Sequence, residues 1–241
     1  MQPQQPGARM SIWTRIAEAV AALGRGEGLA VAFDRLRGAR TAAPERSVAF
    51  TIAVIALGAK MAKADGQVTR DEVAVFRRLF EIPPGEEANA ARVFNLARQD
   101  VAGYDAWARR IAAMFGDDDR KTLTDLLEAL FAIAMADGEW HPGEEAFLRE
   151  VAAIFGLGEP CFRMLRARFV EGAPRDPHDV LGVDPGATLE AARAAWKAAV
   201  RDSHPDVLAA RGVPPEAVRL AERRLVAVNA AWEEIRGRHA A

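Results

Sequence analysis

The sequence predicts an all-α protein. Alanine is abundant along the 241 residues, and it loses no side-chain entropy when it enters a helix. Apolar residues recur at helical spacing in several segments, whereas no segment alternates between polar and apolar residues as a half-buried strand would. Half of the residues are hydrophobic and 27% are charged, which is typical of a globular protein.

The charge balance and the cysteine content exclude several function classes. The formal net charge is −2, whereas a general nucleic-acid binder is normally basic, so we expect no nucleic-acid partner. The single cysteine, Cys161, cannot form a disulfide within the chain and fits a reducing compartment. We interpret it as a small buried hydrophobic residue.

The first 44 residues are predicted to form a tail and two short helices. Residues 1–9 are rich in Gln and Pro and look disordered. Residues 12–23 have amphipathic spacing, and residues 29–36 can form a second short helix. Residues 40–46, which include Pro44, are predicted to be a linker.

The longest apolar run, residues 48–59, is too short to cross a bilayer, which needs roughly twenty residues. We interpret it as a buried core helix. Charged residues interrupt the segment after Ser11, so it is not a signal peptide. Because the chain begins at Met1, we expect no tethering segment ahead of it. The sequence therefore predicts a cytoplasmic protein with no transmembrane segment.

A weak internal repeat organises a helical domain predicted over residues 45–171. Residues 62–66 match residues 134–138 at an offset of 72, and each copy is predicted to be a helix, an Ala-Asp-Gly turn and a helix. Gly66 and Gly138 fit the left-handed C′ position that ends a helix. The run at 116–119 can cap the first helix of the second copy.

The acidic residues of the repeat have three interpretations. Glu72 and Glu144 fit capping positions of the helices that follow the turns. Alternatively, the two acidic turns bind a divalent metal, although their spacing lacks the alternating oxygen ligands of an EF-hand, or they form a docking surface for another protein. Apart from this possible metal, the sequence indicates no cofactor.

A short linker at 172–176 precedes a smaller helical unit at 177–241. Helices are predicted at 178–181, 189–202 and 215–236. The two long helices carry apolar residues at three- and four-residue steps, so they are expected to pack as an antiparallel hairpin. Trp196 and Trp232 lie on the facing sides and are expected to supply much of the buried area.

A positive stripe and an exposed turn lie next to this hairpin seam. Arg193, Lys197 and Arg201 stand four residues apart on the first long helix. Pro205 disfavours helical geometry at His204, so the helix should end there and leave His204, Pro205 and Asp206 in a turn.

These residues resemble the J-domain of the DnaJ family. The resemblance rests on the His-Asp-Val-Leu-Gly-Val start at 178–183, Trp196-Lys197, the His-Pro-Asp tripeptide at 204–206 and the Val-Asn-Ala-Ala-Trp ending at 228–232. The repeat domain resembles the TerB-like helical domain that precedes the J-domain in the DjlA subgroup. Some TerB-family members have been linked to metal binding through acidic residues, so the resemblance implies Asp65, Glu72, Asp137 and Glu144 as candidate metal ligands. The implied fold is a TerB-like helical bundle followed by a small J-domain hairpin.

The resemblance implies a co-chaperone that is not itself an enzyme. It would bind a DnaK-type chaperone and stimulate ATP hydrolysis by that partner, while an unknown client would bind the N-terminal domain. The implied partner-binding residues are His204, Pro205, Asp206, Arg193, Lys197 and Arg201. No sequence motif for a nucleophile or a phosphate-binding loop suggests an activity of its own.

Several positions depart from the family pattern. Val207 follows the tripeptide where Lys is usual, Ala198 replaces a basic residue in mid-helix, and Ser203 stands where an aromatic residue or His is common. An extended loop is expected at 208–216, as in the DjlA subgroup. The alternative is a metal-binding or stress-response TerB-like module with a weakly active J-domain.

Overall fold

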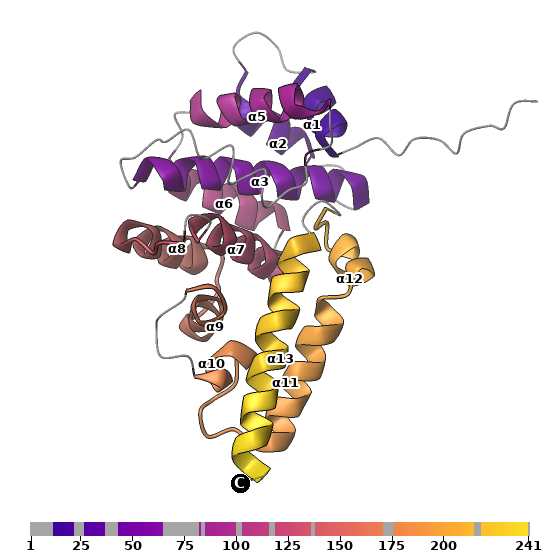
Figure 1. Cartoon of the computed structure of the whole chain (residues 1–241). Helices are drawn as coiled ribbons and strands as arrows, with labels where there is room; N and C mark the ends of the chain where they lie inside the picture. The colour runs from indigo at the N-terminus through magenta and orange to yellow at the C-terminus, as the bar shows by residue number, and fades with distance from the viewer. Residues whose placement is uncertain are drawn as a thin grey trace, which may run out of the picture.

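A computed structural model describes residues 12–21, 27–36, 43–64, 82, 85–99, 103–115, 119–135, 138–170, 176–214 and 218–240. All regular elements in these ranges are helices, which confirms the predicted all-α class (Figure 1). Their bounds are α1 Ile12–Ala21, α2 Leu29–Leu36, α3 Ala43–Ala64, α5 Glu87–Gln99, α6 Tyr104–Phe115, α7 Arg120–Ala134, α8 Pro142–Ile154, α9 Glu159–Phe169, α10 Pro177–Leu181, α11 Leu189–Asp202, α12 Pro205–Ala210 and α13 Val218–Ala240. We call residues 12–170 the N-terminal unit and residues 176–240 the C-terminal unit.

Helix α3 lies at the centre of the N-terminal unit. It contacts α1, α2, α5, α6, α7 and α8, and every side chain of the run 48–57 is buried. A helix that is apolar on all sides must be surrounded by other elements, and this one is. The predicted buried core helix is therefore confirmed.

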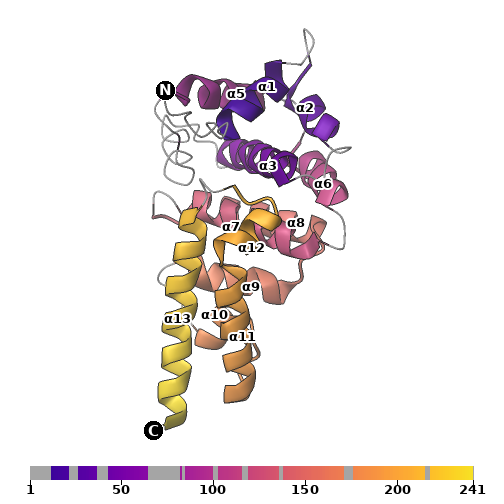
Figure 2. The same ribbon diagram turned by 90° about the vertical axis from the view of Figure 1, so that its right-hand side faces the viewer.

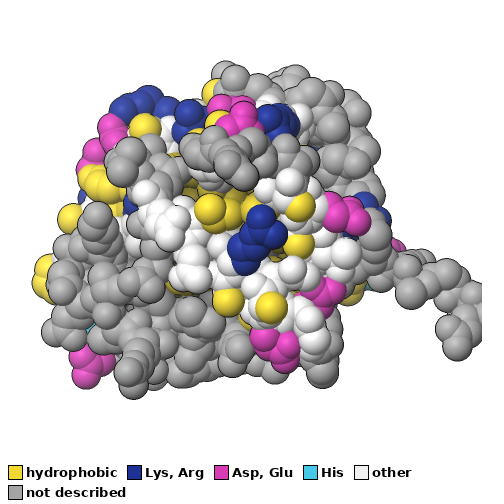
Figure 3. Space-filling model, turned by 90° about the horizontal axis from the view of Figure 1, so that it is seen from above, with side chains coloured by type: hydrophobic (Ala, Val, Ile, Leu, Met, Phe, Trp, Pro, Cys, Tyr) yellow, Lys and Arg dark blue, Asp and Glu magenta, His cyan; other side chains and the backbone are white. Residues whose placement is uncertain are grey.

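The short helices α1 and α2 belong to the same core. Trp13, Ile16 and Phe33 are fully buried, and the ring of Phe33 packs edge-to-face against Trp107 with centroids 5.7 Å apart. The core thus extends ahead of residue 45. Figure 3 shows the face over these helices, where described side chains of both charge signs are mixed with hydrophobic groups.

The linker expected at 40–46 is wrong at its C-terminal end. Helix α3 begins at Ala43, so Pro44 lies in its first turn. Proline is tolerated there because the first N–H groups of a helix have no partner within it. Residues 37–42 lie outside the described ranges.

The turn chemistry expected around the repeat is only partly correct. Asp119 is the N-cap of α7, but its side chain accepts from the Thr122 hydroxyl and from Arg46 instead of a backbone N–H. Gly138 has a left-handed φ of 88°, yet it lies three residues beyond the C-cap Met135 and not at C′. The counterpart Gly66 and the tail at 1–9 lie outside the residues that the structure describes.

The C-terminal unit contains the expected hairpin of α11 and α13. The rings of Trp196 and Trp232 stack with centroids 5.5 Å apart, and Trp196 Nε1 donates to Asn229 Oδ1 at 2.8 Å. Val228 and Ile235 are fully buried in the seam. Helix α13 ends at Ala240, beyond the expected residue 236.

Part of the expected loop is helical. Residues 205–210 form α12, with His204 as its N-cap and Pro205 in its first turn. The same proline that ends α11 therefore starts the next helix, because its fixed φ suits a first helical turn.

The two units lie directly against each other. Figure 2 shows the upper end of the hairpin beside α7, with α9 and α10 alongside. Leu220 and Ala221, at the start of α13, are buried in the core of the N-terminal unit instead of the hairpin seam. Arg168 of α9 also donates from Nε to the carbonyl of Val180 in α10 at 3.0 Å.

Candidate functional site

The HPD segment, which we define as residues 203–213, begins where α11 ends. His204 adopts an extended backbone with φ −65° and ψ 135°, as expected for a residue that precedes proline. Its Nδ1 accepts a hydrogen bond from the Asp206 N–H at 3.2 Å. The histidine thus caps α12 with its own ring, and this bond fixes the direction of the imidazole.

The side chains of His204 and Asp206 face solvent. They are 61% and 94% exposed, and His204 Nδ1 lies 3.7 Å from Asp206 Oδ2. Catalytic groups normally lie in a cleft that excludes water, which this turn does not provide. The arrangement suits contact with another protein.

The three basic residues of α11 are also exposed. Arg193, Lys197 and Arg201 follow at four-residue steps, so they lie on one side of the helix that ends at the HPD segment. Ser203 is only 2% exposed and donates from Oγ to the carbonyl of Ala199 at 2.7 Å. A small residue at this position therefore fills a buried space beneath the exposed tripeptide.

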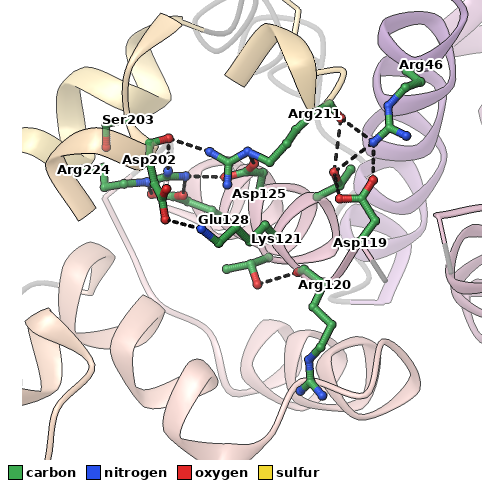
Figure 4. Close-up of polar contacts among 12 residues, drawn as sticks. Arg46, Asp119, Arg120, Lys121, Asp125, Glu128, Asp202, Ser203, Arg211 and Arg224 are labelled. Atoms are coloured by element: carbon green, nitrogen blue, oxygen red, sulfur yellow. Dashed lines mark hydrogen bonds and ion pairs between the residues drawn. The ribbon is translucent and has the colours of Figure 1, made fainter. Parts of the chain in front are cut away.

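A buried ion cluster, which the sequence analysis missed, lies behind the HPD segment. We define it as Asp125 and Glu128 of α7 with Arg211 and Arg224 of the C-terminal unit (Figure 4). Arg224 Nη2 donates to Asp125 Oδ1 at 2.6 Å, and Arg224 Nε donates to Glu128 Oε1 at 3.2 Å. Arg211 Nε lies 3.3 Å from Asp125 Oδ2. The cluster joins the two units.

The cluster is desolvated. Asp125, Glu128 and Arg224 are 2%, 0% and 6% exposed. Burial raises the pKa of Asp125 to about 6, although the charges of Arg224 and Arg211 oppose the shift. Burial alone would lower the pKa of Arg224, but the charges of Glu128 and Asp125 outweigh it and the pKa is raised. Arg224 therefore stays charged while Asp125 titrates in the weakly acidic range.

The raised pKa of Asp125 predicts a pH-dependent contribution to stability. The folded chain holds this proton more tightly than the unfolded chain, whose carboxyl has its ordinary value of 3.8, so the contribution falls as pH rises from about 4 to about 6. Relative to Asp125→Asn, the wild type should lose up to about 3 kcal/mol of unfolding free energy between pH 4 and pH 7. Urea unfolding at both pH values checks this, with the exposed Asp184→Asn as a control that shows no such difference. A constant gap between wild type and Asp125→Asn would contradict the prediction.

A weak sequence signal could have pointed to the cluster. Asp125 and Glu128 stand three residues apart inside the apolar stretch 123–134, on a helix whose other residues there are mostly buried. Acidic residues are almost never fully buried unless they are paired. The sequence gives no indication, however, of which cation pairs with them.

The predicted metal ligands are not brought together in the described part of the chain. Asp65, Glu72 and Asp137 lie outside it. Glu144 accepts from the backbone N–H of His141 at 3.1 Å, which is the capping role that its position suggested. Among the described residues, no group of three or more His, Cys, Asp or Glu side chains could hold a metal ion.

Cys161 has the surroundings expected of a structural thiol. It is partly buried against the N-terminal core, and burial raises the pKa of its thiol. A raised pKa disfavours the thiolate that acts as a nucleophile.

Comparison with known proteins shows what the chain is similar to. Residues 51–167, from α3 to α9, match the family model described as tellurite resistance protein TerB. The co-chaperone protein DjlA of Photobacterium profundum is 28% identical over 226 residues, covering 82% of this chain and 80% of the relative. The chain is DjlA-like and contains a TerB-like domain. The co-chaperone protein DjlA of Escherichia coli is 26% identical over 235 residues, covering 85% of this chain and 86% of the relative.

These relatives are named as co-chaperone proteins, and the matches do not favour the metal-binding alternative. No solved structure gives a significant match.

The predicted cytoplasmic location was wrong. The similar proteins are DjlA co-chaperones, which are known to be anchored in a membrane. The start of the chain at Met1 and the short apolar run at 48–59 do not bear on that question. In the described helices, none has the length and apolar character needed to cross a membrane.

Proposed function

We propose that this DjlA-like protein binds a DnaK-type chaperone through a C-terminal J-domain, residues 177–241, and stimulates ATP hydrolysis by that partner. The observation that carries the proposal is the exposed His204-Pro205-Asp206 turn at the end of a helix with three exposed basic residues. The names of the relatives support it, since they are co-chaperone proteins. Because the C-terminal unit binds the chaperone in this proposal, the N-terminal unit would bind the client.

The charges of α11 and the HPD turn have different roles in this proposal. Exposed charges at the edge of an interface mainly set the association rate and its salt dependence, whereas a few desolvated groups decide the stability of the complex. Arg193, Lys197 and Arg201 would attract an acidic surface of the chaperone. The turn would then make the contacts that trigger hydrolysis on the partner.

The test is single-turnover ATP hydrolysis by purified DnaK-type chaperones with increasing amounts of the full chain. We expect saturable acceleration with at least one partner, preferably the chaperone of the same organism. The chain alone should hydrolyse no ATP. If no chaperone responds, the proposed function is wrong.

The basic stripe should give a salt-dependent contribution. Replacing Arg193, Lys197 and Arg201 together by Gln should raise the half-saturating concentration of the chain roughly three- to tenfold at low salt, because electrostatic steering is lost. The difference should shrink at about 1 M salt, where the Debye length is about 3 Å. A matched control replaces Arg236 and Arg238, which pair with Glu233 and Glu234 at the far end of α13. Equal behaviour of the two variants would contradict a specific role for the stripe.

A further inference from the structure

The start of the HPD segment is held by contacts that lead to the N-terminal unit. The carbonyl of Asp202, the last residue of α11, accepts from Arg211 Nη2 at 2.5 Å and from Arg224 Nη1 at 3.5 Å. Both arginines contact Asp125 of α7 (Figure 4). The carboxylate of Asp202 also accepts from Lys121 Nζ of α7 at 2.8 Å. Contacts that lead to helix α7 therefore hold the end of α11 in place.

The far end of the segment is held by the same unit. The Thr122 hydroxyl of α7 shares its proton between Asp119 Oδ1 at 2.6 Å and the carbonyl of Arg211 at 3.2 Å. The same carbonyl also accepts from Arg46 Nη2 of α3 at 3.3 Å. Arg46 is itself paired with Asp119. The N-terminal unit thus bonds directly to the backbone at Arg211. At Asp202 it acts on the backbone indirectly, through the two arginines that pair with Asp125.

Apolar packing reinforces these hydrogen bonds. Leu208 and Val213 are 6% and 3% exposed within the N-terminal core. Gly212 has a φ of 87°, and a Cβ there would lie 2.7 Å from Arg46 Cβ. Only glycine permits both this conformation and this approach to α3. The segment is therefore shaped to fit the N-terminal unit.

These contacts leave the exposed tripeptide uncovered. The side chains of His204 and Asp206 face solvent, while the residues on either side of them contact the N-terminal unit. A segment that is already ordered avoids the entropic cost of ordering on binding, and its apparent affinity is not reduced by a low population of the binding-competent shape.

We propose that the N-terminal unit holds the HPD segment in the shape that the chaperone binds, with Arg211 and Thr122 as positioning residues. This inference rests on the proposed function and extends it. The N-terminal unit then contributes to chaperone binding without needing to touch the chaperone.

Two variants of the full chain test the two ends of the segment. Arg211→Met removes the bond to the Asp202 carbonyl, and Thr122→Val removes the hydroxyl that is shared between the Arg211 carbonyl and Asp119. Matched controls are Arg223→Met, an exposed neighbour of the cluster on α13, and Thr124→Val, whose hydroxyl donates to Arg120 within α7. All are compared at a temperature at which thermal unfolding shows each variant to be folded.

Each positioning variant should raise the half-saturating concentration in the ATPase assay about tenfold, as expected if only about a tenth of the molecules keep the competent shape. The maximum acceleration should not change, because the contacting residues are intact. Hydrogen exchange should be faster at the amides of Leu208 and Val213, which bond within the segment, and unchanged in the α11–α13 hairpin. A general loss of stability would instead speed exchange in the hairpin as well.

The outcomes separate the two proposals. If wild type stimulates a chaperone and both variants match it in half-saturating concentration and in exchange, the positioning role is wrong and the proposed function stands. If both variants lose maximum acceleration at unchanged half-saturating concentration, the positioning role is also wrong. If wild type stimulates no chaperone, the proposed function fails and this inference fails with it.

Discussion

His204→Gln should reduce the acceleration of ATP hydrolysis to near the level of the chaperone alone. In the structure Nδ1 accepts from the Asp206 N–H, so the proton is on Nε2, which can donate to the partner. Glutamine cannot both accept the backbone N–H in this geometry and present a donor in the same place. Replacing a residue of this kind at the centre of an interface weakens the binding free energy by about 2–4 kcal/mol.

The control for this variant is His239→Gln, an exposed histidine in the last turn of α13. It should stimulate as wild type does. The circular dichroism spectrum of His204→Gln should match wild type, since the side chain is exposed, and the loss of the α12 cap should lower stability by only about 1 kcal/mol. Full stimulation by His204→Gln would show that the HPD turn does not act as proposed.

Arg224→Ala should destabilise the chain by about 3–5 kcal/mol, the typical cost of removing one partner from a buried ion pair. In the variant the carboxylates of Asp125 and Glu128 stay buried, and both have lost the guanidinium of Arg224 with which they pair in the wild type. Urea unfolding at pH 7 measures the change. The exposed neighbour Arg223→Ala is the control and should change stability by no more than about 0.5 kcal/mol.

A combined variant separates lost charge pairing from lost packing. Arg224→Met with Asp125→Asn and Glu128→Gln removes three of the four charges of the cluster, leaves Arg211 and keeps similar volumes. It should recover at least half of the stability lost in Arg224→Ala, because neutral groups cost less to bury than unpaired ions. If the combined variant is as unstable as Arg224→Ala, the orphaned carboxylates are not the cause.

Local patterns in the sequence were sufficient for many elements of the fold. The apolar run at 48–59 predicted the buried α3, and Thr188 and Pro205 mark the two ends of α11 as the structure has them. The end of the linker near Pro44 and the start of the loop after Asp206 are helical, contrary to the prediction. At Pro44 and Pro205 proline was taken as a helix breaker, whereas at both positions it lies in the first turn of a helix.

The sequence by itself determined the all-α class, the hairpin and the exposed tripeptide beside a basic stripe. Helical periodicity, capping and the effect of proline on its neighbour act over a few residues and can be recognised along the chain. Only the tertiary structure decided that Arg224 pairs with Asp125 and Glu128, 99 and 96 residues away, and that Gly212 lies against Arg46. Such contacts depend on how the helices pack, and the desolvation that makes them strong exists only after the chain has folded.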